Sequence, residues 1–158
     1  MLAGLAQIAA TEFAPGFYPS WYFTLTAVSF GLILPVIASL QVIHQPLRAS
    51  GAVLGTIAGA TVVILGLGAS ANPDLIPAAL FVRGVWWWTI GKLWVETAAL
   101  PRALGWLTML LAIACFALVA IYALTGISMG SPDLPARMIL GAWLIALGLS
   151  LWQNARVP

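Results

Sequence analysis

Five long apolar runs, separated by short polar breaks, dominate the pattern of hydrophobic and polar positions along the chain. They cover residues 21–43, 51–69, 77–95, 103–124 and 136–152. Each is close to the roughly 20 residues that an α-helix needs to cross the hydrocarbon core of a bilayer. The pattern therefore predicts an all-α integral membrane protein, a bundle of five transmembrane helices.

The composition agrees with a lipid environment. The chain is 63% hydrophobic and 6% charged, whereas a soluble domain carries about 25% charged residues. A water-soluble fold of this size cannot bury so much apolar surface. The net charge of +2 is small and dispersed, so no nucleic-acid partner is expected. The single cysteine, Cys115, excludes an internal disulfide.

The charged residues indicate the orientation of the five spans, because successive connections alternate between the two sides of the membrane. One side receives Arg48, Lys92, Glu96, Arg102 and Arg156, and the other receives Glu12, Asp74, Asp133 and Arg137. Basic residues favour the first side, which the positive-inside rule makes cytoplasmic. We therefore predict an outer N-terminus and a cytoplasmic C-terminus. Residues 1–20 would form an outer interfacial arm, and residues 154–158 a cytoplasmic tail.

Local signals predict where some helices begin or bend. The sequence Asn72-Pro73-Asp74 places a capping side chain, a proline and an acid in the order that favours a helix start. Ser50 is available as a cap for the second span. Pro35 should weaken or kink the first span, because proline removes one backbone hydrogen-bond donor.

Regularly spaced glycines predict where the helices pack. Lipid gives helices no hydrophobic reason to associate, so close backbone approach between small residues becomes important. Gly51, Gly55 and Gly59 repeat at four-residue spacing and would form a smooth strip on the second span. The strip could pack within the chain or against another subunit. Paired glycines on the third and fifth spans are further packing candidates: Gly84, Gly91, Gly141 and Gly148.

Arg83 lies inside the third predicted span, three residues before the run Trp86, Trp87 and Trp88. A charged side chain within a span is costly and is a functional candidate by default. These four residues are the predicted contacts for a ligand or partner. Arg83 could instead snorkel outward or form a structural ion pair, since helical side chains lean toward the helix N-terminus. Successive tryptophans point about 100° apart, so they cannot all face one pocket.

The remaining polar residues give little support for catalysis. His44, the single histidine, ends the first span and could ligate a haem or chlorophyll metal or serve as an interfacial polar residue. Glu96 follows Lys92 by four residues, which predicts an exposed ion pair. HExxH, Walker and CxxC patterns do not occur in the sequence, and its GxSxG match, Gly126 to Gly130, lies in a connection between two predicted spans and not at a strand-to-helix turn. We therefore expect a protein that is not an enzyme, with no catalytic residues.

One connection carries a family resemblance. The segment Gly91–Leu107 reads GKLWVETAALPRALGWL. It resembles a connection in uncharacterised bacterial polytopic membrane proteins, in which Leu-Pro-Arg-x-Leu-Gly-Trp leads into the next span. The resemblance implies a multi-pass protein of the bacterial cytoplasmic (inner) membrane, and it implies no activity.

These patterns predict an accessory or structural subunit of a larger membrane complex, such as an energy-converting or photosynthetic assembly. Its partners would be other integral membrane subunits and membrane lipid. The alternative is a small transporter or carrier of a lipophilic or anionic ligand that uses Arg83. The sequence requires no cofactor; bound lipid is expected, and a pigment or quinone is a further candidate.

Overall fold

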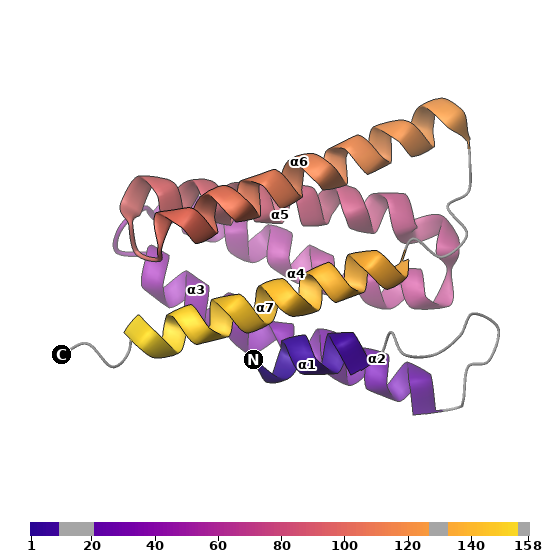
Figure 1. The fold of residues 1–158 in the computed structure, drawn as a ribbon, viewed down its shortest axis with the longest axis horizontal. Helices are drawn as coiled ribbons and strands as arrows, with labels where there is room; N and C mark the ends of the chain where they lie inside the picture. The colour runs from indigo at the N-terminus through magenta and orange to yellow at the C-terminus, as the bar shows by residue number, and fades with distance from the viewer. Residues whose placement is uncertain (10–20, 127–132, 155–158) are drawn as a thin grey trace. The chain divides into compact units, whose positions relative to one another are not determined.

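The computed structural model describes residues 1–9, 21–126 and 133–154, and these residues are almost entirely helical (Figure 1). The elements are α1 (Leu2–Ala9), α2 (Trp21–Gly31), α3 (Ile33–His44), α4 (Ala49–Ala71), the 3-10 turn η1 (Pro73–Leu75), α5 (Ile76–Thr97), α6 (Arg102–Thr125) and α7 (Asp133–Asn154). No strand occurs in the described ranges. The predicted all-α class is confirmed.

Three helical segments are long and apolar enough to cross a membrane: Thr24–His44, Ala49–Ala71 and Arg102–Thr125. Helix α5 has 22 residues, but its charged side chains and tryptophans lower its hydropathy below that of the three. The apolar part of α7, Met138–Gln153, is shorter than a span among the described residues. The structure thus shows a helical chain with three candidate membrane spans.

The chain forms two compact units, and the first contains α1, α2 and α7. Helix α1 packs against both α2 and α7. Two glycines of α7 lie at this contact: a Cβ on Gly141 would come within 2.8 Å of the Gly4 carbonyl oxygen, and Gly148 lies against Met1. Residues Leu2–Ala9 therefore form a packed helix within the range 1–20, for which the interfacial arm stays a prediction. Residues 10–20 and the predicted tail at 155–158 lie outside the described residues.

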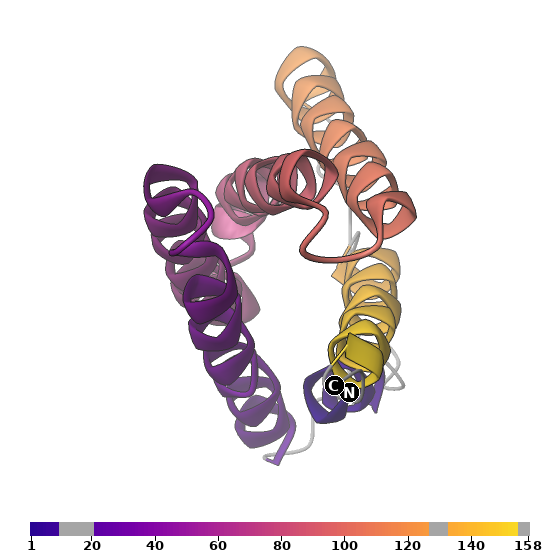
Figure 2. The same cartoon turned by 90° about the vertical axis from the view of Figure 1, so that its left-hand side faces the viewer.

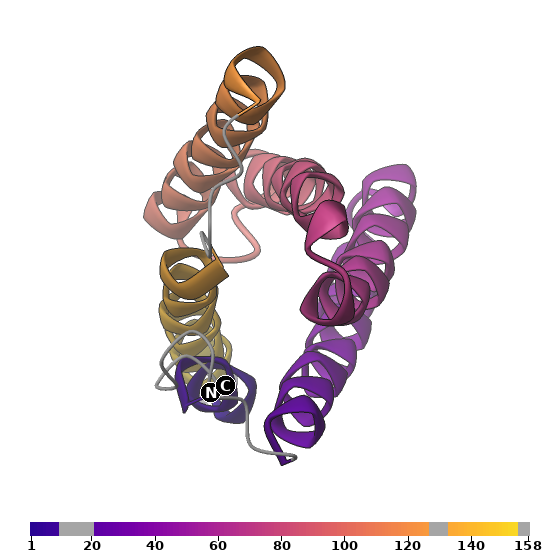
Figure 3. The same ribbon diagram turned by 90° about the vertical axis from the view of Figure 1, so that its right-hand side faces the viewer.

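The second unit, residues Leu34–Ser128, contains most of α3 and all of α4, α5 and α6. Helix α5 lies between α6 on one side and α3 and α4 on the other (Figures 2 and 3). Its contact with α6 is close because Gly91 on α5 faces Gly105 on α6. Gly84, which lies seven residues before Gly91 on α5, lies against the ring of Phe116 on α6. The predicted packing glycines of α5 therefore point toward α6.

The glycine strip of α4 packs within the chain, against α5. A Cβ on Gly51 would come within 2.7 Å of Leu93, and one on Gly59 within 2.8 Å of the Trp86 Nε1 atom. Gly55 has more room, with Ile90 at 3.4 Å. Of the two interpretations of this strip, the structure supports packing inside the chain.

Helix ends follow two of the three local predictions. The first apolar run is interrupted at Leu32 between α2 and α3, where Pro35 can supply no backbone donor. The Asn72 side chain accepts a 3.1 Å hydrogen bond from the Asp74 amide, as the capping pattern predicts. Ser50 as a cap was wrong: α4 begins one residue before it, so Arg48 is the N-cap and makes no side-chain cap bond.

Candidate functional site

Helix α5 carries the candidate residues, and the structure separates them into two groups. Arg83, Trp86 and Trp87 are buried, each at most 3% exposed, whereas Trp88 is 40% exposed. The prediction that the three tryptophans cannot share one pocket is confirmed. Arg83 is covered by protein, and its snorkelling or pairing stays a prediction.

Trp86 joins three helices of the second unit. A Cβ on Gly59 of α4 would come within 2.8 Å of the Trp86 indole nitrogen and within 3.0 Å of the Ile37 side chain on α3. Only a residue without a Cβ allows both side chains to occupy this position. The absence of a side chain at Gly59 thus makes room for the buried Trp86 ring.

His44 lies at the end of α3 and is buried, 1% exposed. Its Nδ1 atom is 2.7 Å from the Leu40 carbonyl oxygen, and its ring centroid is 6.5 Å from that of Trp94 on α5. The sequence left open an interfacial polar residue or a metal ligand at this position, and both stay predictions. The rotation of α3 turns this face of the helix toward α4 and α5.

A small internal cavity of about 10 Å³ lies beside His44, between α3, α4 and α5. Such a volume holds one water molecule at most. A haem or chlorophyll macrocycle therefore does not fit at His44 unless these helices separate. No group of three or more metal-ligating His, Cys, Asp or Glu side chains occurs among the described residues.

A polar link between α3 and α4 borders the same cavity. The Thr56 hydroxyl on α4 lies 2.5 Å from the Gln41 Oε1 atom on α3, to which it donates a hydrogen bond, and 3.0 Å from the Ala52 carbonyl oxygen. Gln41, Thr56 and His44 all line the cavity. Interhelical hydrogen bonds of this kind help to hold membrane helices together.

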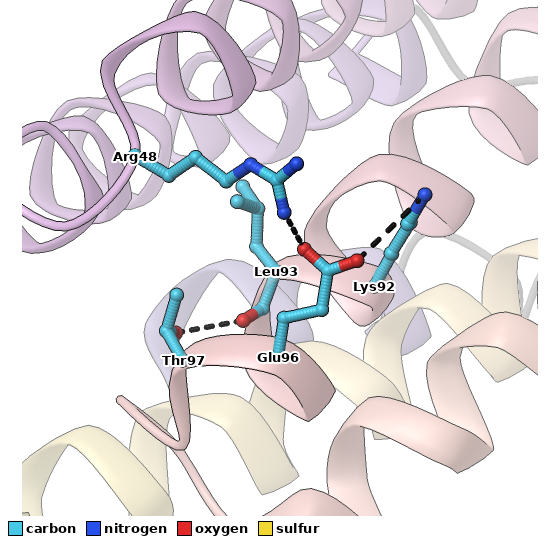
Figure 4. Close-up of polar contacts among 5 residues, drawn as sticks. All are labelled: Arg48, Lys92, Leu93, Glu96 and Thr97. Atoms are coloured by element: carbon cyan, nitrogen blue, oxygen red, sulfur yellow. Dashed lines mark hydrogen bonds and ion pairs between the residues drawn. The ribbon is translucent and has the colours of Figure 1, made fainter.

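Three charged side chains meet where the N-terminal end of α4 lies beside the C-terminal end of α5 (Figure 4). The Glu96 carboxylate pairs with Arg48 at the start of α4, and its second oxygen lies 3.7 Å from the Lys92 Nζ atom. The Lys92–Glu96 pair is the one that the four-residue spacing predicts. The contact with Arg48 was missed, although the alternation of spans placed Arg48 and Glu96 on one side of the membrane.

A surface groove of about 370 Å³ opens beside this cluster, between α4 and α5. One end of the groove carries the charges of the cluster, and the other end is apolar. Its lining residues are Arg48, Ser50, Gly51, Leu54, Trp88, Thr89, Lys92, Leu93 and Glu96. Trp88, the exposed member of the tryptophan run, is thus part of a different site from Trp86 and Trp87.

No protein-family model, curated protein or solved structure matches the chain. The resemblance of residues 91–107 to bacterial polytopic membrane proteins therefore stays a prediction. In the structure this segment contains the end of α5, a left-handed Ala98 with φ of 52°, and the start of α6. Any assignment of function rests on the geometry of the helices and of the groove.

Proposed function

We propose that the protein is an accessory, non-enzymatic subunit of a larger complex in the bacterial inner membrane. In this proposal α5 and α7 cross the membrane in addition to the three candidate spans, so the chain makes five crossings. Its N-terminus lies outside and its C-terminus in the cytoplasm. The distribution of basic residues supports this orientation. The 22-residue length of α5 and of α7 supports the number of crossings, because each helix would reach about 33 Å.

The observation that supports a subunit role is the exposure of α6. Helix α6 has the highest hydropathy of the candidate spans, yet only 17% of its most apolar 18-residue window is buried. Its partner within the second unit is α5. Large apolar side chains cover the remaining surface of α6: Trp106, Leu107, Leu110, Ile113, Ile121 and Leu124. We propose that this surface, the α6 face, packs against another membrane protein.

A gentle purification from the source membrane tests this proposal. We expect other integral membrane polypeptides to co-purify in fixed stoichiometry and to be identified by mass spectrometry. Leu110→Trp on the α6 face should abolish this association. Ile64→Trp is the matched control, because Ile64 is an exposed apolar residue on α4. A chain that purifies natively as a lone monomer would overturn the proposal.

A second candidate is a carrier of an anionic or lipophilic ligand that uses Arg83. The observation that favours it is the burial of this charged residue, which is 3% exposed. Buried charged residues of membrane helices often mark ligand or ion pathways. In reconstituted vesicles, Arg83→Leu should then abolish uptake or binding while the helical content stays unchanged. Arg102→Leu, at an exposed position, is the control, and equal uptake by both variants would exclude the carrier.

A further inference from the structure

We propose that the groove between α4 and α5 binds an anionic phospholipid. Arg48 and Lys92 would hold the phosphate, and Leu54 and Trp88 would lie along the beginning of the acyl chains. The inference rests on the charge, the shape and the position of the groove, and it does not depend on the proposed subunit role.

The charges at the rim of the groove suit one phosphodiester. Arg48 and Lys92 bring two positive charges and Glu96 brings one negative charge, so the rim keeps an excess of one positive charge. A guanidinium has five N–H donors and an ammonium has three, so both cations can bind a phosphate while they contact Glu96. Their side chains are 53% and 56% exposed, which leaves them accessible to a ligand.

The first turn of α4 adds to the positive character of the rim. Ser50 and Gly51 lie in this turn and line the groove. Backbone N–H groups of a first helical turn have no partner within the helix, and the helix dipole makes this end partly positive. Ser50 and Gly51 thus line the same groove as the two cationic side chains.

The shape of the groove favours a lipid over a soluble anion. Trp88 and Glu96 are eight residues apart on α5, so the lining spans about 12 Å along the helix, with Lys92 midway between them. Over this distance the exposed side chains change from charged to apolar, with Leu54 50% exposed at the inner end. A free phosphate would use the rim and leave the apolar wall without a role.

Native mass spectrometry of the purified full chain tests the lipid site. The protein is incubated with equal amounts of phosphatidylglycerol and phosphatidylcholine that carry the same acyl chains. We expect preferential retention of phosphatidylglycerol, and about a fivefold loss of this preference in Arg48→Ala and in Lys92→Ala, since one cation near anionic lipid contributes about 1 kcal/mol. Arg102→Ala should keep the preference, because Arg102 is not part of the groove.

Glu96→Gln separates a lipid site from a merely structural ion-pair cluster. Removing the carboxylate frees both cations, so retention of phosphatidylglycerol should rise above that of the unmodified protein. A structural role predicts a less stable chain with no gain in retention. Equal retention of the two lipids, equal effects of Arg48→Ala and Arg102→Ala, or no gain in Glu96→Gln would each overturn the proposal. Displacement of phosphatidylglycerol by millimolar inorganic phosphate would also overturn it, in favour of a free-anion site.

Discussion

Gly91 on α5 and Gly105 on α6 face each other at backbone distance. A Cβ on Gly91 would lie 2.8 Å from the Gly105 carbonyl oxygen, and a Cβ on Gly105 would lie 2.9 Å from the Gly91 carbonyl oxygen. Neither carbonyl can move aside without separating the two helices. This contact fixes the distance between α5 and α6, and α5 carries both Arg83 and one wall of the groove.

The Gly91–Gly105 contact predicts that even a glycine-to-alanine substitution destabilises the folded chain. Gly105→Ala should lower the free energy of unfolding by about 1–3 kcal/mol, because the added methyl meets a backbone atom. Gly55→Ala is the control: its methyl meets Ile90 at an ordinary 3.4 Å, and alanine favours helix. Thermal unfolding in detergent can be followed with a thiol-reactive dye on the buried Cys115. Equal midpoints for the two variants would contradict the close packing.

The burial of His44 predicts a structural role for this residue. His44→Ala should lower the free energy of unfolding by about 2 kcal/mol or more, because it empties a filled position between helices. Gln45→Ala, at the exposed neighbouring position, should have little effect. The visible absorption spectrum of the natively purified protein should show no band that His44→Ala removes. Loss of such a band in this variant would show that His44 ligates a pigment or haem.

The proposed five crossings can be tested by labelling with a membrane-impermeant thiol reagent. In a Cys115→Ser background, single cysteines are placed at Gln45, Asn72 and Ala99, which flank α4 and α5. The cysteine at position 72 should react in intact cells, and those at positions 45 and 99 should react only after permeabilisation. If positions 72 and 99 react from the same side, α5 does not cross the membrane.

Hydrophobic length and polar breaks are sufficient to predict where most helices lie. The expected spans at 51–69 and 103–124 fall within α4 (Ala49–Ala71) and α6 (Arg102–Thr125), because each is bounded by residues that favour a helix end. The proline at position 35 likewise predicts the interruption between α2 and α3. The ends of these helices and the interruption near Pro35 are local properties, because residues close in the sequence determine them.

The rotation and the neighbours of each helix are not local properties. His44 is buried because α3 turns one face toward α4 and α5, and the apolar runs have no strong periodicity that would reveal this face. The ion pair between Arg48 and Glu96 joins residues 48 positions apart. The alternation of spans predicts that these two residues share a side of the membrane, but only the packing of α4 on α5 brings them into contact.

Photo-crosslinking in the native membrane tests the subunit role most directly. A photoreactive amino acid is placed at Leu110 on the α6 face and, as a control, at Ile64 on α4. We predict that position 110 gives one discrete adduct with a membrane polypeptide that also co-purifies stoichiometrically with the chain, and that position 64 gives no such adduct. Adducts with lipid alone at both positions would contradict a subunit that packs through its α6 face.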